Sequence, residues 1–262
     1  MNVFAGGSVE PLPPWIVACL FAPFIGSFLS VVVMRHDAVS SALAGRSECP
    51  ACGTQLGVME LVPVLSWAAQ RGRCRHCRAG VSLFYPAIEL AALGVAVWSA
   101  CLMSGLALWA SCCLGWALIA LAALDMKYFL LPDFLTLPLI AAGLLANALL
   151  DHLSLFDHAL GAALGYAFVR LLRFAYRSIR GREGMGLGDA KLLAAAGAWV
   201  SWTGLPSVLV IASLLGLVGV LTQLLRGRRI DPAQHVPFGA FLGAGLWLVW
   251  LYGPLAWGGA GL

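Results

Sequence analysis

Long apolar runs separated by short polar connections dominate the pattern of this chain. Each run is near the roughly 20 residues that an α-helix needs to cross the hydrocarbon core of a bilayer. The pattern therefore predicts an all-α polytopic membrane protein with about eight transmembrane helices. The expected helices, of which the sixth is the shortest, are Pro14–Met34, Phe84–Met103, Leu106–Leu124, Phe134–Leu150, Phe156–Tyr176, Ala190–Trp202, Leu205–Leu225 and Val236–Tyr252.

One long polar stretch, Arg35–Leu83, interrupts this pattern and must lie outside the membrane. We therefore expect an N-terminal transmembrane helix at 1–34, a small loop domain at 35–83 and a transmembrane bundle at 84–262. The first residues lack the basic region of a cleavable signal peptide, so the first apolar run is expected to remain as a span. Composition agrees: 61% apolar residues, 11% charged residues and a mean hydropathy of +0.90 are far from a soluble globular chain.

The basic residues orient the predicted bundle. If the N-terminus is outside, all 16 Lys and Arg fall on one side of the membrane, and the connections on the other side contain none. Positively charged loops favour the cytoplasm, so we expect the N-terminus on the outer side of the membrane and the loop domain on the cytoplasmic side. The Arg-rich run RLLRFAYRSIRGREG is better explained by contact with membrane lipid than by nucleic acid, which we do not expect as a partner.

Three carboxylates, Asp125, Asp133 and Asp189, fall near span ends at this inner face. Asp133 follows Pro132 and is well placed as a helix N-cap. Asp189 could also be an N-cap, but capping does not require the glycines of GMGLGD before it. Asp125 closes a helix at its C-terminal end, where the helix dipole disfavours an anion, and burial in hydrocarbon adds roughly 2.5–3.5 kcal/mol. These costs indicate a functional role for Asp125, and the preceding glycines together with a position at the membrane indicate one for Asp189.

Two such acids could carry out aspartic protease chemistry. Held close in a poorly solvated site, they share a proton, so one can activate water while the other donates to the developing oxyanion. A proton-coupled transporter could also use paired intramembrane acids, although these acids lie toward one face and the two halves show no obvious repeat. A non-catalytic assembly factor is a third possibility. Glu89, early in the second span, is a further buried acid that could be structural or contribute to the site.

Four cysteines in the loop domain, Cys49, Cys52, Cys74 and Cys77, form two CxxC pairs separated by 21 residues. This spacing suits a tetrahedral thiolate site for a structural Zn²⁺, which would fold the loop rather than catalyse. Disulfides are the competing interpretation, but they rarely persist in the reducing cytoplasm. His76 lies inside the second pair and is expected to face solvent, because four thiolates already close the coordination sphere.

Several motifs, taken together and in order, give the chain a family resemblance. With Asp125, Asp189 and the two CxxC pairs, the chain resembles the bacterial type IV prepilin peptidases, which are membrane aspartic proteases of the GxGD type. The motifs that carry the likeness are GSFLSVVVMR, SECPAC, LVPVLSW, RGRCRHCR, YPAIE, LDMKYFLLPDFLTLPL, GMGLGDAKLLAAAGAW and VPFGAFLGAG.

The resemblance implies a multi-pass enzyme of the bacterial inner membrane, with its N-terminus in the periplasm. At the cytoplasmic face, such an enzyme removes the short basic leader from type IV prepilins and from the pseudopilins of type II secretion. It carries catalysis onto Asp125 and Asp189 and gives Asp133 and Lys191 supporting roles. Many members also methylate the new N-terminal residue with S-adenosylmethionine, and the resemblance assigns no residue here to that cofactor.

This sequence departs from the family pattern at three places: Ser30 stands where Asn is usual, MELVP replaces a DNIP-like stretch, and Ala240 replaces Pro. The departures leave both aspartates untouched. The family's methyltransferase function is generally placed in the N-terminal and loop region, where the first two departures lie. A leader peptidase without methyltransferase activity is therefore the alternative.

Overall fold

The computed structural model describes residues 12–36, 47–150, 155–181, 186–227 and 237–255. The predicted all-α class is confirmed, since these residues form helices and only two isolated β-bridges, Glu48 with Gln55 and Arg73 with Gly80. In chain order the helices are α1 (Pro14–Met34), the 3-10 helix η2 (Val58–Leu61), α3 (Leu65–Ala69), α4 (Phe84–Leu102), α5 (Gly105–Tyr128), α6 (Asp133–Leu150), α7 (Leu155–Arg180), α8 (Leu187–Leu225) and α9 (Phe238–Tyr252).

Six of the described helices, α1 and α4 to α8, are long and apolar enough to cross a membrane, and α9 is a shorter apolar helix of 15 residues. All eight predicted runs fall on these seven helices. The count differs because the sixth and seventh runs are both parts of α8, which has 39 residues and non-helical dihedral angles at Val200 and Ser201. The chain is therefore a multi-pass membrane protein.

The two parts of α8 run in opposite directions. The side chain of Leu131 lies against both Gly188 and Gly239, so the starts of α8 and α9 are close together. Phe241, in the first turn of α9, lies against Gly219 near the end of α8. The second part of α8 thus returns to the end of the bundle where the first part begins. Ser201, with φ +59°, is where the backbone turns.

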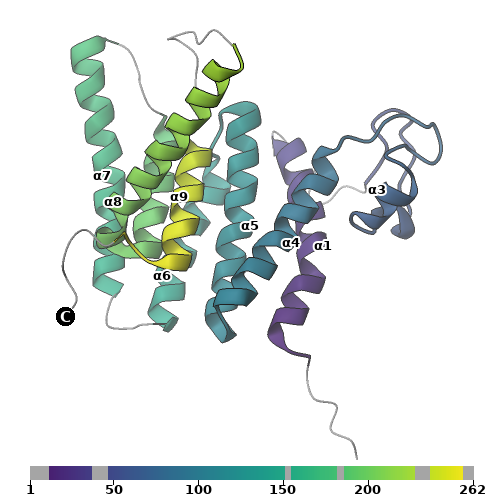
Figure 1. The fold of residues 1–262 in the computed structure, drawn as a ribbon, viewed down its shortest axis with the longest axis horizontal. Coiled ribbons are helices and arrows are strands. Elements are labelled where there is room, and N and C mark those ends of the chain that lie inside the picture. Colours follow the sequence, from purple (N-terminus) through teal and green to yellow (C-terminus); the bar gives the residue numbers. More distant parts are fainter. Residues whose placement is uncertain (1–11, 37–46, 151–154, 182–185, 228–236, 256–262) are drawn as a thin grey trace, which may run out of the picture.

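The core lies on two sides of α5 (Figure 1). On one side, residues spaced by four, such as Leu108, Cys112 and Trp116, pack with α1 and α4. On the other side, residues such as Leu114 and Leu118 pack with α6, α8 and α9. A helix that is apolar all round is suited to a protein core or to a membrane span, and α5 has neighbours on both of these sides. The end of α5, where Asp125 lies, is therefore fixed by both halves of the bundle.

Small residues allow the helices to approach closely. A β-carbon added at Gly197 of α8 would lie 2.1 Å from the carbonyl carbon of Gly161 in α7, and one at Gly165 would lie 2.4 Å from the Leu193 oxygen. On the other side of the bundle, a β-carbon at Gly26 of α1 would lie 2.6 Å from the Cα of Glu89 in α4. Backbone contact of this kind is typical of membrane helices, whose packing depends on van der Waals contact rather than on the hydrophobic effect.

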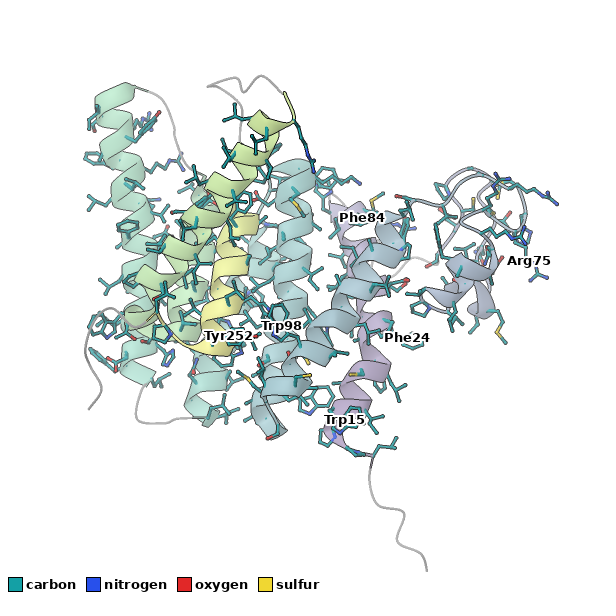
Figure 2. All side chains as sticks on the ribbon, in the orientation of Figure 1. Trp15, Phe24, Arg75, Phe84, Trp98 and Tyr252 are labelled. Carbon is teal, nitrogen blue, oxygen red and sulfur yellow. The ribbon has the colours of Figure 1, made fainter. Side chains whose placement is uncertain are left out.

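Large apolar side chains cover the outer surface of the helices. Trp15 and Phe24 project outward from α1 (Figure 2) and are 53% and 56% exposed, as expected for residues that face lipid. The described part of the long polar loop, residues 47–83, forms a small lobe at one side of the bundle, next to α1 and α4. The division into domains at 34 and 83 stays a prediction; in the packing, α4 shares its core with α1.

We expect Gly197→Ala to destabilise the protein, because the added methyl group overlaps the backbone of α7 and overpacking costs roughly 1–3 kcal/mol. The matched control is Gly94→Ala in α4, where a β-carbon meets nothing within 4 Å. That change should be neutral or stabilising, since Ala exceeds Gly in helix propensity by up to about 1 kcal/mol. Thermal unfolding in detergent measures both, and an equal rise in Tm for the two variants would contradict the packing described here.

Candidate active site and metal centre

Asp125 lies in the last turn of α5 and is 6% exposed. Its Oδ2 accepts a hydrogen bond of 3.0 Å from the backbone N–H of Ala240, and the Gly239 N–H is a second donor. Both donors belong to the first turn of α9, where N–H groups have no partner within the helix and the helix dipole is positive. The dipole of α5 therefore disfavours the negative charge of Asp125, and the dipole and N–H groups at the start of α9 offset that cost.

Asp189 lies in the first turn of α8 and is partly exposed. Its Oδ2 accepts a hydrogen bond of 3.3 Å from the N–H of Gly186, the N-cap residue. The capping interpretation is therefore half right: Asp189 bonds the cap residue from the third helical position instead of being the cap. Gly184, the first glycine of the GMGLGD stretch, lies outside the described residues.

The structure brings Asp125 and Asp189 together. They are close enough for the charge on Asp125 to act on Asp189. Leu131, in the connection after α5, fills the space beside them by contacting Gly188 and Gly239. Side chains from the end of α5 and the start of α8 therefore share one site with the start of α9. Their role in catalysis stays a prediction at this point.

The start of α9 was missed by the sequence reasoning. A β-carbon at Gly239 would lie 2.9 Å from Asp125 Oδ2 and 2.8 Å from Leu131 Cδ1, so any larger residue would displace the Asp125 carboxylate or the Leu131 side chain. The available signal was the VPFG sequence, with proline and glycine at a helix start beside a buried acid. It could not be used because the partner of that glycine lies more than 100 residues earlier in the chain.

Asp133 and Lys191 join the starts of α6 and α8. Asp133 is the first residue of α6, and its Oδ1 accepts a hydrogen bond from Lys191 Nζ in an ion pair. The two side chains are 59% and 25% exposed, so the pair contributes at most about 1 kcal/mol to stability. Because Lys191 is two residues after Asp189, its ion pair with Asp133 is well placed to position the start of α8.

The four loop cysteines occupy two matching turns. In the first turn the Cys49 N–H donates to Thr54 O and the chain reverses at Gly53, with φ +67°. In the second turn the Cys74 N–H donates to Ala79 O and the reversal is at Arg78, with φ +60°. Each left-handed residue directly follows the second cysteine of its pair. The turns therefore present both sulfurs of each pair on one side.

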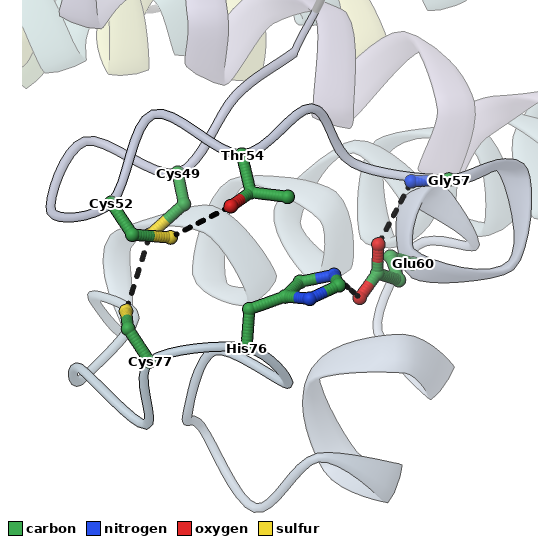
Figure 3. Close-up of polar contacts among 7 residues, drawn as sticks. All are labelled: Cys49, Cys52, Thr54, Gly57, Glu60, His76 and Cys77. Atoms are coloured by element: carbon green, nitrogen blue, oxygen red, sulfur yellow. Dashed lines mark hydrogen bonds and ion pairs between the residues drawn. The ribbon is translucent and has the colours of Figure 1, made fainter.

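The sulfur atoms of Cys49, Cys52, Cys74 and Cys77 all lie within 4.8 Å of one another, and those of Cys49 and Cys77 are 3.8 Å apart (Figure 3). A tetrahedral site with zinc–sulfur bonds of about 2.3 Å has sulfur–sulfur edges of about 3.8 Å. Hydrogen bonding with Thr54 lowers the pKa of Cys52 to about 6, which favours the thiolate that a metal requires. The four free thiols could hold a metal ion.

Two other residues singled out from the sequence, His76 and Glu89, belong to the lobe or contact it. The side chain of His76 is 48% exposed, and its Nε2 is 3.7 Å from Glu60 Oε1, outside the group of sulfurs (Figure 3). Glu89 is 5% exposed, and its Oε2 accepts a hydrogen bond of 2.7 Å from the Val64 N–H of the lobe. Glu89 thus joins α4 to the lobe instead of joining the aspartate pair.

Comparison with known proteins decides the family. Residues 20–103 match the bacterial peptidase A24 N-terminal domain, and residues 112–221 match the type IV leader peptidase family. A protein of Aeromonas hydrophila named prepilin leader peptidase/N-methyltransferase is 39% identical to this chain over 92% of both sequences. The chain belongs to the type IV leader peptidase family. Both aspartates lie within the residues that match the leader peptidase family, and the four cysteines lie within the residues that match the N-terminal domain.

Other relatives in the leader peptidase family carry the same name. A Pseudomonas aeruginosa protein is 33% identical over 93% of this chain and 92% of its own length. A Burkholderia pseudomallei protein is 47% identical over 76% of this chain and 65% of its own length. No solved structure matches the chain.

We expect the cysteine cluster to bind one metal ion per chain, and Cys74→Ser to remove it, because three thiolates hold the metal far less tightly than four. Cys113→Ser is the matched control, since Cys113 lies in α5 and outside the cluster. Elemental analysis of the purified variants measures the metal content. Equal metal content in both variants would show that the four sulfurs are not the site.

Proposed function

We propose that this member of the leader peptidase family removes the leader from type IV prepilins and type II secretion pseudopilins, and then methylates the new N-terminus. The single observation that carries the peptidase proposal is the meeting of Asp125 with Asp189 at one end of the bundle. One carboxylate takes a proton from the attacking water, and the other carboxyl donates a proton to the oxyanion. Collapse of this intermediate breaks the C–N bond, and the amine leaves with a proton.

The surroundings of the pair support this chemistry. Asp125 is buried, so its interactions with the reacting atoms are stronger than they would be in water. The N–H groups at the start of α9 hold its carboxylate in place. Gly186 and Gly188 next to Asp189 have no side chains that would block a substrate backbone. The Asp133–Lys191 pair holds the start of α8 from the other side.

The orientation that fits best places this site at the cytoplasmic face of the inner membrane and the N-terminus in the periplasm. Lys191 and Lys127 lie at the same end of the bundle as the aspartates, Lys127 being 5.4 Å from the ring centre of Phe84 at the start of α4. At the other end Trp202 donates to Asp157, and lysine and arginine are absent from the described connections there. Basic residues favour the cytoplasmic side.

Zinc is the metal that the four thiolates fit best, because a closed tetrahedral set of sulfurs is typical of structural Zn²⁺ sites. It would hold the two turns of the lobe together and leave no open position for a substrate. The proposed methyl donor is S-adenosylmethionine, which supplies an electrophilic methyl group when bound. A leader peptidase without methylation is the alternative. Proton-coupled transport has no support in the family matches, and the two acids lie at helix ends instead of in the middle of the bundle.

We expect Asp125→Asn and Asp189→Asn each to lower the rate of leader cleavage by about 100-fold or more, because each change removes an acid–base group. The matched control is Asp157→Asn, at the opposite end of the bundle. Cleavage of a model prepilin by each purified variant in detergent or liposomes is followed by gel shift. Rates near that of the unsubstituted protein in both site variants would refute the aspartate pair.

The second half of the proposal concerns the product. Incubation of the unsubstituted protein with a model prepilin and S-adenosylmethionine should give a product whose mass corresponds to leader removal plus one methyl group. Intact-mass spectrometry with and without the donor separates the two steps. A product that lacks the methyl group under both conditions would restrict the function to leader removal.

A further inference from the structure

A cavity of about 320 Å³ lies between the cysteine lobe and the helices α1 and α4. This volume is at the lower end of the range of small-molecule sites, roughly 300–1,000 Å³. Its wall combines acids, two arginines and aromatic rings from the lobe and the helices: Glu60, Glu89, Arg35, Arg73, Trp67 and Tyr85. It is distinct from the aspartate pair, neither of whose residues lines it.

Glu89 is the most deeply buried charged residue of the wall, at 5% exposure. Its Oε2 accepts the hydrogen bond from the Val64 N–H, and the Ser27 side chain is a second partner. Val64 has φ +59°, which is strained for a β-branched residue, so the bond holds the lobe in a conformation that it would not adopt alone. Strain of this kind is frequent where a ligand is held.

Glu60 also lines this cavity, and one of its carboxylate oxygens is buried without a hydrogen-bond partner in the described part of the chain. One carboxylate oxygen, Oε2, accepts a hydrogen bond of 2.8 Å from the Gly57 N–H. The other, Oε1, has no hydrogen-bond partner among the described residues, and Nε2 of the half-exposed His76 lies 3.7 Å from it. A buried acceptor without a partner is costly, and such atoms are rare in folded proteins. A ligand that donates a hydrogen bond or carries positive charge would satisfy it.

We propose that this cavity is the site of S-adenosylmethionine, with Glu60 and Glu89 as the residues that contact its positive and hydrogen-bond-donating groups. The molecule carries a sulfonium and an ammonium ion, a carboxylate, ribose hydroxyl groups and a flat adenine ring, and Arg35 and Arg73 in the wall are the groups that suit its carboxylate. Carboxylates and aromatic faces such as those of Trp67 and Tyr85 are the groups that bind cations and flat rings. The inference rests on the methylation half of the proposed function and assigns its cofactor site.

The cavity lies on the same side of the membrane as the aspartate pair. Met34 lines the cavity, and its sulfur is 2.8 Å from Lys127 Nζ. Lys127 follows Asp125 by two residues in α5. A substrate that has been cut beside Asp125 can therefore present its new amine to the cavity without crossing the membrane. Cys49 and Cys74 also line the cavity, so the proposed zinc site stabilises one of its walls.

Transfer of the methyl group from S-adenosylmethionine to the new N-terminal amine needs no reactant beyond these two molecules and water. The ammonium of the shortened substrate first loses one proton to water. The nitrogen lone pair of the neutral amine then forms a bond to the methyl carbon as the carbon–sulfur bond breaks, and its electron pair stays on sulfur. The products are the N-methylated ammonium, S-adenosylhomocysteine and one released proton. No further oxidant or reductant is required.

Glu60→Gln and Glu89→Gln test the assignment, because glutamine keeps an acceptor for the Gly57 or Val64 N–H and removes only the charge. Calorimetric titration of S-adenosylmethionine into the purified, metal-loaded protein in detergent measures Kd. Each variant should raise Kd about tenfold or more, the cost of losing a contact between charged groups. Asp125→Asn, which should stop cleavage, should change Kd by no more than about twofold.

Metal content shows whether each variant is folded, and leader cleavage gives a second check for the two glutamine variants. Unchanged Kd in both folded glutamine variants, with binding and methylation intact in the unsubstituted protein, would overturn the cavity assignment and leave the proposed function standing. A loss of binding in Asp125→Asn equal to that in the glutamine variants would also overturn it. Absence of binding and of methylated product in the unsubstituted protein would overturn the inference and the methylation proposal together.

Discussion

The arrangement of this protein depends on the bond between a carboxylate at the end of one helix and the free N–H groups at the start of another. Asp125 is buried where the dipole of α5 opposes its charge. The first turn of α9 supplies the donors and the positive dipole that offset this cost. Because α9 packs along α5 and the second part of α8, this contact also places the start of α8, and with it Asp189, beside Asp125.

Close backbone packing makes that contact possible. Gly239 leaves room for the carboxylate of Asp125, Gly188 leaves room for Leu131, and Gly161 and Gly197 let α7 lie directly against α8. In hydrocarbon, helices gain little from burying apolar surface, so contact distance decides how well they hold together. The precision of the carboxylate site is thus a consequence of glycines on three different helices, and two of them, Gly161 and Gly239, are far from the acids in the sequence.

The lobe and the bundle join the two proposed reactions at one face of the membrane. The lobe is too small to fold on a hydrophobic core of its own. Its four converging sulfurs could hold a metal ion, which would stabilise the lobe in place of such a core. Glu89 ties it to α4, and the cavity of about 320 Å³ forms between the two. In the proposed scheme, leader removal beside Asp125 and methyl transfer in the cavity follow each other within reach of the same substrate end.

The sequence by itself determined the helices, the two CxxC turns and the end of the bundle where the acids lie, because these depend on local properties: apolar length, residue spacing and the distribution of charge. The helix bounds differ from the prediction by only a few residues, and the eight runs became seven helices only because α8 continues through Val200 and Ser201. Tertiary structure alone decided that α9 supplies the donors for Asp125, that Asp133 pairs with Lys191, and that Glu89 faces the lobe. Each of these contacts joins residues far apart in the chain, and no local pattern of apolar and polar positions encodes which helix lies beside which.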